Sequence, residues 1–295
     1  MLKDKTFTSY LHLHLIVFVW GFTAVLGALI TLEALPLVWF RMSIASVFIL
    51  IYVFFAKISL KITLQSLIRY LIAGLVIALH WYTFFQAIKV SNISITLACL
   101  STGAFFTSIL EPIFFKRKII LYEVVLGLMV IAGLYLIFKV EIKYIQGIIL
   151  ALTSAFLSAS FSIINGKLAK DDSPTIISFY ELLGGVLFFS LFLLFTGSFN
   201  YSFFQISTND LLWMGLLSSV CTAYAFIASV QVMKYLSPYT VMLTINLEPI
   251  YGIILALWVF GDKEKMNTPF YLGAFIILIT VILNGIFKNK TKKKE

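Results

Sequence analysis

The chain has 295 residues, of which 61% are hydrophobic, 16% aromatic and only 12% charged. A soluble core cannot bury so much apolar surface, so the composition excludes an ordinary soluble protein and indicates a membrane protein. The formal net charge of +9 does not require a nucleic-acid partner, and we expect none. Basic residues that flank the cytoplasmic ends of membrane spans are enough to explain it.

A membrane-spanning helix needs about 20 mostly apolar residues. Windows of that length predict ten spans, with little sequence left for a soluble domain. In chain order they cover residues 10–30, 36–56, 69–88, 93–115, 119–138, 145–165, 174–196, 210–233, 238–260 and 269–287. The sequence therefore predicts an all-α integral membrane protein with ten transmembrane helices.

The placement of lysine and arginine predicts the orientation of these spans. Most of the 22 basic residues fall on one side if the N-terminus is cytoplasmic, including residues 116–118 and the C-terminal tail. Both termini are then cytoplasmic. The first span is long enough to cross a bilayer, so we expect it to be retained and not cleaved as a signal peptide.

The spans divide into two equal groups, five in residues 1–140 and five in residues 141–295. Because five is odd, the second half enters the membrane from the opposite side, which predicts two inverted repeats. Inverted repeats are common in secondary transporters, whose binding site lies between the halves near the middle of the bilayer.

The tetrapeptide LEPI occurs twice, at residues 110–113 and 247–250. Alignment of the two halves on their turns and closing loops pairs Gly103 with Glu248, so the two copies are not equivalent positions of the repeat. Glu248 is expected near the middle of its span and Glu111 nearer the cytoplasmic end. A carboxylate at such depth normally faces a bundle interior or a water-filled cavity. Both glutamates are therefore candidates for binding a substrate or a coupling proton.

A proline follows each glutamate. Pro112 and Pro249 each remove a backbone hydrogen bond, so we expect both helices to break there and to bend at these hinges. Thr244 shares a polar stripe of the ninth span with Glu248, and Asn246 lies between them. The alternative is structural: Glu248 caps a kink, and Glu111 in the fourth span pairs with the adjacent basic loop.

Five further residues are candidates for a central binding site. His80 can carry a proton or bind substrate, although a lone histidine in a bundle is more often structural. Arg41 can bind a carboxylate or extend to the outer interface. Trp20 can stack on a substrate or only pack. Asn165 ends a stripe of small residues on the sixth span, and Tyr224 lies on the eighth.

The stretches ALHWYTFFQAIKVSNISITLACLSTGAFFTSILEPIFFKRKI and TAYAFIASVQVMKYLSPYTVMLTINLEPIYGIILALWVFGDKE have the same plan: a helix dotted with polar residues, a tight turn, and a longer helix closed by a charged loop. Together with three short motifs they resemble the EamA family of the drug/metabolite transporter superfamily. The motifs are Trp20-Gly21, Tyr235-Leu236-Ser237-Pro238 leading to Leu247-Glu248-Pro249, and Phe260-Gly261-Asp262. Where the family usually has a glycine-glutamate-arginine turn after the fourth helix, this chain has Lys116-Arg117-Lys118.

The resemblance implies export of small metabolites, often amino acids, from the cytoplasm. We expect a bacterial inner membrane as the location and alternating access, in which the two halves rock around a central cavity, as the mechanism. Efflux of drugs or lipophilic cations is the alternative, and a membrane receptor or a membrane-embedded enzyme is a more distant one. The sequence contains no Walker motif, HExxH or GxSxG, so we predict no enzyme activity, metal or cofactor. Uphill transport must then draw on a gradient, with Glu248, Glu111 and His80 as the proton carriers available.

The fifth and tenth spans lack a polar stripe through their middles, which indicates peripheral or dimer-forming helices. We therefore expect a monomer or a homodimer, with a small-molecule substrate and the lipid bilayer as partners.

Overall fold

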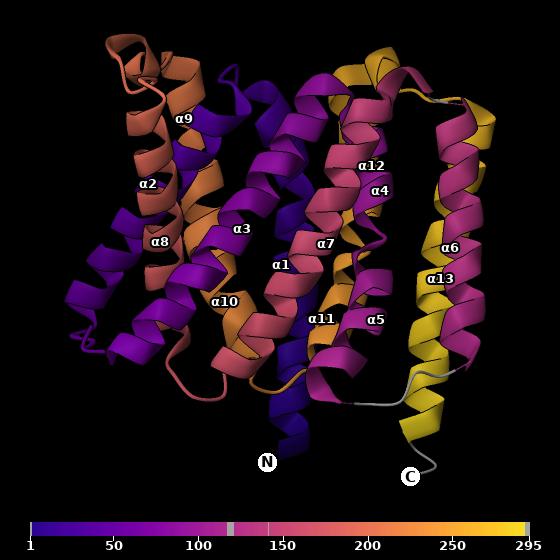
Figure 1. Cartoon of the computed structure of the whole chain (residues 1–295), viewed down its shortest axis with the longest axis horizontal. Coiled ribbons are helices and arrows are strands. Elements are labelled where there is room, and N and C mark those ends of the chain that lie inside the picture. The colour runs from indigo at the N-terminus through magenta and orange to yellow at the C-terminus, as the bar shows by residue number, and fades with distance from the viewer. Residues whose placement is uncertain (1, 117–120, 141, 293–295) are drawn as a thin grey trace.

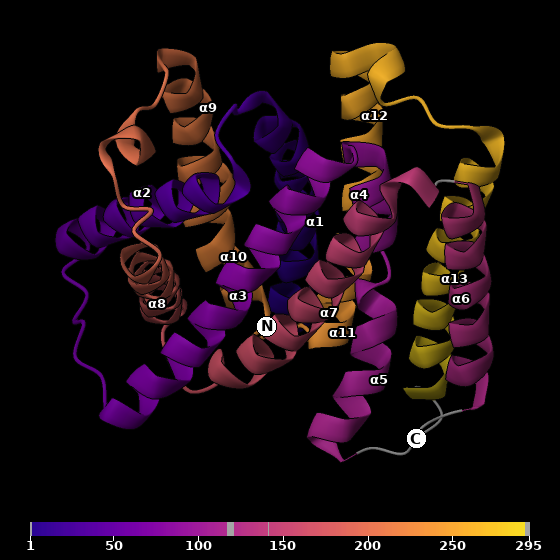
Figure 2. The same ribbon diagram turned by 45° about the horizontal axis from the view of Figure 1, so that its top comes forward.

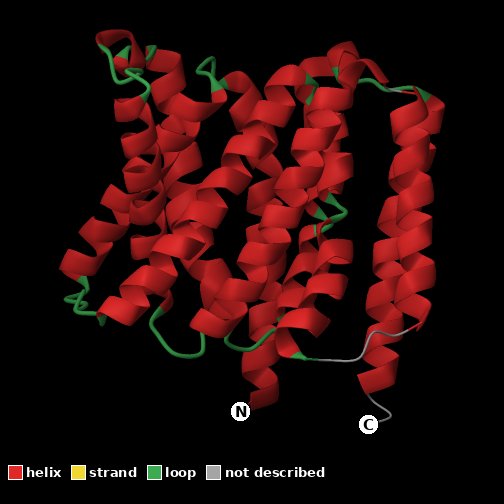
Figure 3. Ribbon diagram, in the orientation of Figure 1, coloured by secondary structure: helices red, strands yellow, loops and turns green. Residues whose placement is uncertain are grey.

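The structure is a computed structural model that describes residues 2–116, 121–140 and 142–292. Within these ranges the regular secondary structure is helical, joined by short turns (Figure 3). Eight helical stretches of the described chain are long and apolar enough to cross a membrane, and two shorter apolar stretches cover Val125–Ile137 and Thr268–Thr280. The predicted all-α membrane protein is confirmed.

The helices follow the two predicted halves. The first half contains α1 (Leu2–Leu29), α2 (Ala34–Phe55), α3 (Leu64–Val90), α4 (Ile93–Leu100), α5 (Gly103–Phe115) and α6 (Leu121–Val140). The second half contains α7 (Ile145–Leu168), α8 (Pro174–Phe195), α9 (Thr208–Ser218), a π-helix (Ser219–Tyr224), α10 (Ala225–Val232), α11 (Pro238–Ile245), α12 (Glu248–Phe260) and α13 (Thr268–Lys292). Short 3₁₀ turns cover Ile142–Tyr144, Tyr201–Phe204 and Gly261–Lys263.

The described ends of the chain lie on the same face of the bundle (Figure 1). We call this the inner face, because the lysine and arginine distribution predicts that it is cytoplasmic. The opposite face is the outer face. It carries the connections from α1 to α2, α3 to α4, α8 to α9 and α12 to α13 (Figure 2).

The fourth and ninth spans are each divided into two helices of matching length. α4 and α11 have 8 residues each, and α5 and α12 have 13 each. Gly103 and Glu248 are the first residues of α5 and α12. The sequence alignment that pairs these two residues is therefore confirmed, and the match supports the inverted repeat.

The break in the fourth span does not lie at its proline, contrary to expectation. Pro112 is inside α5, which continues to Phe115. The span breaks earlier, at Ser101 and Thr102, whose hydroxyls donate to the carbonyls of Ala98 and Cys99 at 2.6 and 2.7 Å. Such local side-chain hydrogen bonds compete with the backbone pattern of a helix.

The break in the ninth span lies close to its proline, at Asn246 and Leu247. Pro249 occupies the first turn of α12, where a missing amide hydrogen costs no helical hydrogen bond. The polar stripe expected to run through Thr244 and Glu248 is therefore divided between two helices, α11 and α12.

α6 and α13 lie side by side at the edge of the bundle, away from the other helices (Figures 1 and 2). Their backbones touch at Gly133 and Gly273: a Cβ built on either residue would lie 2.8 Å from the other's carbonyl oxygen. Small residues allow this kind of close approach between membrane helices. These two helices are peripheral, as the absence of a polar stripe indicates.

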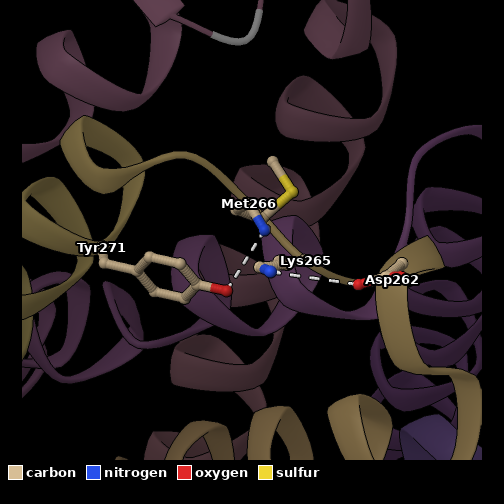
Figure 4. A network of polar contacts seen from close by, with 4 residues as sticks. All are labelled: Asp262, Lys265, Met266 and Tyr271. Atoms are coloured by element: carbon tan, nitrogen blue, oxygen red, sulfur yellow. Dashed lines mark hydrogen bonds and ion pairs between the residues drawn. The ribbon is translucent and has the colours of Figure 1, made fainter.

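The connection between α12 and α13 has two short-range contacts of its own on the outer face (Figure 4). The amide of Met266 donates to the Tyr271 hydroxyl at 3.1 Å, and Lys265 lies 4.0 Å from Asp262. Glu264 in the same connection is buried, and its carboxylate accepts from the amides of Ile93 and Ser94 at 3.0 and 2.9 Å. The second half thus holds the outer end of α4.

Candidate functional site

A cavity of about 70 Å³ lies among helices of both halves, with room for several water molecules. α1, α2, α3 and α4 line it from the first half, and α7, α10, α11 and α12 from the second. The lining residues are Trp20, Thr23, Arg41, Ile77, His80, Trp81, Phe84, Leu100, Ser158, Phe161, Ser162, Phe226, Ser229, Met233, Met242, Ile245 and Glu248.

Both helix breaks open onto this cavity. Leu100 ends α4, Ile245 ends α11 and Glu248 begins α12, and all three line the cavity. Glu248 is 7% exposed, and no residue in the described part of the chain hydrogen-bonds to its carboxylate. The position at a helix N-terminus favours a negative charge, because the helix dipole is positive there.

Arg41 is buried beside the cavity and does not extend to the outer interface, which corrects the alternative that the sequence had left open. Only 1% of Arg41 is exposed. Its Nε donates to Thr222 Oγ1 at 2.7 Å, and its guanidinium carbon lies 3.8 Å from the centroid of the Trp81 ring. Its Nη1 is buried and has no hydrogen-bond partner in the part of the chain that the structure describes.

The cavity therefore holds one acidic and one permanently basic side chain. Both Arg41 and Glu248 line it, and no ion pair joins the two in the described residues. An unpaired buried charge is costly. The arrangement is suited to a ligand that brings a negative and a positive group of its own.

A π-helix at Ser219–Tyr224 positions Arg41 and Trp20. Thr222 Oγ1, which accepts from Arg41, donates to the Leu217 carbonyl at 2.7 Å. Trp20 Nε1 donates to the carbonyl of Cys221 at 3.1 Å. π-helical turns often occur at functional sites. The sequence predicts one continuous helix here, because a single extra residue in a turn leaves no clear signal in hydropathy.

His80 is hydrogen-bonded across the two halves to Ser154 on α7. Its Nδ1 lies 2.9 Å from the Ser154 carbonyl and 2.8 Å from Ser154 Oγ, which donates to the His80 carbonyl at 3.0 Å. Since the Ser154 carbonyl can only accept, the ring hydrogen is assigned to Nδ1. A neutral His80 then keeps Nε2 as an acceptor for a cavity ligand.

The apolar wall of the cavity is aromatic. Phe161 stacks on Phe226 with ring centroids 5.5 Å apart, and Trp81 lies 5.6 Å from Phe226. Phe84 and Trp20 complete the aromatic lining. Such a wall offers a surface to a planar or apolar group of a ligand.

Four other candidates do not line the cavity. Thr244 donates to the Thr240 carbonyl of its own helix at 2.9 Å. Glu111 is buried in α5. Asn246 lies in the break before Glu248, and its Nδ2 is buried without a hydrogen-bond partner. Asn165 binds Glu181, as described below.

Tyr224 lies on the outside of the bundle. It is 44% exposed, and its hydroxyl is 2.9 Å from Nε2 of His12. The pair links the end of the π-helix to α1 at a distance from the cavity.

Two comparisons place this architecture among known proteins. The profile of the EamA-like transporter family matches residues 8–139 and 145–286. The chain belongs to the EamA-like transporter family. The two matches correspond to the two five-span halves, so each half is one EamA repeat.

Among solved structures, one described only as a crystal structure of a protein resembles this EamA-like transporter with a TM-score of 0.67 and 13% identity, over 93% of this chain and 95% of the other. At that identity the likeness shows the fold alone. The comparison with curated proteins gave no match. Family membership makes the chain a multi-pass membrane transporter and not an enzyme, with a small-molecule substrate and the bilayer as its partners.

Proposed function

We propose that this EamA-like transporter exports amino acids or closely related zwitterions from the cytoplasm by alternating access. The observation that carries the proposal is the unpaired Arg41 and Glu248 on one small cavity. An α-amino acid carries a carboxylate and an ammonium group on the same carbon atom. The cavity presents a group of opposite charge to each of them: Arg41 for the carboxylate and Glu248 for the ammonium group.

Each part of such a substrate has a matching surface. The free Nη1 of Arg41 donates to the carboxylate, because a guanidinium is a directional donor for such anions. The Glu248 carboxylate accepts from the ammonium group, and the serine hydroxyls of α7 offer further polar contacts. The side chain of the substrate lies against the aromatic wall formed by Phe161 and Phe226.

Alternating access is consistent with the contacts that join the two halves at the outer face. Glu264 of the second half holds the start of α4, and Asp210 accepts from the amide and the hydroxyl of Thr31, both at 2.7 Å. Rocking of the halves exchanges these contacts for an opening to the outside. The breaks at residues 101–102 and 246–247, with Pro249 beside the second, provide the flexible points.

Export against a gradient requires an energy source outside the chain, since the sequence contains no nucleotide-binding motif. We propose proton coupling, with Glu248 and His80 as carriers that face the cavity. Glu111, buried in α5, is a further candidate.

Efflux of lipophilic cations is the second candidate, because Glu248 and the aromatic wall would suit a planar cation. Arg41 disfavours it: a buried guanidinium on the same small cavity repels a cationic substrate. Replacement of Arg41 therefore separates the two functions.

The proposal is tested by comparing metabolites in the culture medium and inside cells that produce the wild type, Glu248→Gln, Arg41→Lys or an empty vector. We expect enrichment of amino acids outside the wild-type cells only. Lysine keeps the charge but loses the planar contact with Trp81, so Arg41→Lys should lower export about tenfold. Media that match the empty vector would contradict amino-acid export. Efflux of a lipophilic cation by the wild type, unchanged in an Arg41→Gln variant, would favour the second candidate.

A further inference from the structure

A second buried carboxyl group lies outside the cavity, on α8. Glu181 is 0% exposed, and its Oε1 accepts a hydrogen bond from Nδ2 of Asn165 on α7 at 2.9 Å. Its Oε2 is buried and has no hydrogen-bond partner among the described residues, and the same holds for Oδ1 of Asn165. One neutral amide is thus the polar contact of a fully enclosed carboxyl group.

The helices packed against α8 bring no positive charge to Glu181. On α2, Arg41 is bound to Thr222. α10 contains no titratable side chain. The titratable residues of α3 bring no positive charge to it either. Arg69 is exposed, Tyr70 donates to Asp172, His80 binds Ser154, Tyr82 packs on Phe189 further along α8, and Lys89 donates to the Ile30 carbonyl.

The neighbours on α7 and α8 are also engaged elsewhere. Lys167 is exposed and lies 3.4 Å from the Phe114 carbonyl, to which it donates, while Tyr180 donates to the Leu60 carbonyl. An ionised Glu181 would therefore be an uncompensated charge in apolar surroundings, which is strongly unfavourable. A protonated carboxylic acid is neutral, so it avoids the cost of burying a charge in these surroundings.

Glu181 also lies where the two halves meet, near the inner face. A Cβ on Gly74 of α3 would lie 2.2 Å from the Glu181 carbonyl oxygen, so the backbones of α3 and α8 are in contact there. Nearby, the Tyr70 ring stacks on Tyr180 with centroids 6.3 Å apart. In the alternating access proposed above, rocking of the halves loosens this junction and admits water to it.

The site is connected to the cavity through α7. Asn165 lies three residues after Ser162, which lines the cavity, and residues at this spacing share a helix face. A change in the ionisation of Glu181 therefore acts one helical turn away from the substrate.

We propose that Glu181 and Asn165 form a proton-binding site at the inner junction of the two halves. Glu181 holds a proton on Oε2 while the junction is packed, and Asn165 holds the other oxygen. Opening of the junction hydrates the carboxyl group, which releases its proton to the cytoplasmic water. The coupling role rests on the proposed export function, whereas the bound proton can be tested without any substrate.

The first test is infrared spectroscopy of the purified protein near neutral pH, comparing the wild type with Glu181→Gln and with Glu248→Gln as a control. Glutamine has nearly the same shape as a protonated glutamate, so the fold is preserved. We expect Glu181→Gln to lose the carbonyl absorption of one protonated carboxylic acid, whatever Glu248→Gln does. Loss of a carboxylate absorption instead would overturn the proposal.

The second test uses proteoliposomes and a radiolabelled mixture of the proteinogenic amino acids. An imposed pH gradient should stimulate transport by the wild type, and Glu181→Gln should reduce that stimulation about tenfold while exchange without a gradient stays within about twofold of the wild type. Equal stimulation of both proteins would overturn the coupling role. If the wild type transports no amino acid, the export function fails, and the infrared result still decides whether Glu181 holds a proton.

Discussion

The two broken spans have the same architecture and different chemistry. α4 and α5 repeat the lengths of α11 and α12, yet the second helix begins with Gly103 in one half and with Glu248 in the other. A Cβ on Gly103 would lie 2.8 Å from Cε of Met242, so the first break packs closely against α11. Glu248 instead faces the cavity. The two halves thus share the backbone break, but the charged side chain at the break belongs to the second half.

α4 and α11, the first helices of the two broken spans, differ in the contacts made at their N-terminal ends. α4 has its own cap, Asn92, which accepts from the Ile95 amide at 2.8 Å, and it also receives the carboxylate of Glu264 from the other half. α11 is capped by its own Ser237. One pair is therefore fastened across the two halves at the outer face, while the other is capped locally.

The largest effect is expected from an alanine placed at the start of the second helix in the ninth span, compared with an alanine at the equivalent position of the fourth span. Glu248→Ala should lower amino-acid transport about 100-fold, because a charged contact made in a buried site is typically worth several kcal/mol. Gly103→Ala should stay within about threefold, since the flexible end of Met242 can move away from one added methyl group. Transport of radiolabelled amino acids into proteoliposomes measures both. Equal losses would show that the two breaks do not differ in chemistry.

The sequence predicted the ten spans and the pairing of Gly103 with Glu248, because hydropathy and turn residues are local signals. It did not locate the break at Ser101 and Thr102. Proline is the stronger local breaker, but it can be accommodated within a membrane helix, and α5 continues through Pro112.

The site was less predictable than the fold. Glu248, His80, Trp20 and Arg41 were candidates that the structure brings to one cavity, but burial of Arg41 depends on Thr222 and Trp81, which are distant in sequence. The π-helix and the engagement of Glu264 with α4 depend equally on contacts between segments far apart in the chain. Tyr224 and Asn165 are polar residues within apolar spans, and periodicity alone does not say which face of a helix is turned toward a cavity.

An intermediate effect is expected at the contact between the halves. Glu264→Gln replaces one carboxylate oxygen by an amide group that cannot accept from the Ile93 or Ser94 amides, so it should lower stability by about 1–3 kcal/mol. Asp262→Asn is the matched control in the same connection, because that side chain is 98% exposed. Thermal unfolding in detergent should show a lower Tm for Glu264→Gln and no change for Asp262→Asn. Similar Tm values for all three proteins would mean that Glu264 does not fasten α4.

The smallest effect is expected at the local cap of α11. Ser237 Oγ accepts from the Thr240 amide at 3.2 Å, and loss of such a cap typically costs about 1 kcal/mol. Because α11 has no second acceptor from the other half at this end among the described residues, Ser237→Ala should weaken its first turn without freeing one half from the other. The Tm should therefore fall by less than in Glu264→Gln. A reactive cysteine placed at Ile93, where the backbone amide still donates to Glu264, should become no more accessible from the outer side. If Ser237→Ala exposed that cysteine as much as Glu264→Gln does, a local cap on α11 would control the outer end of α4. The two broken spans would then be held in the same way.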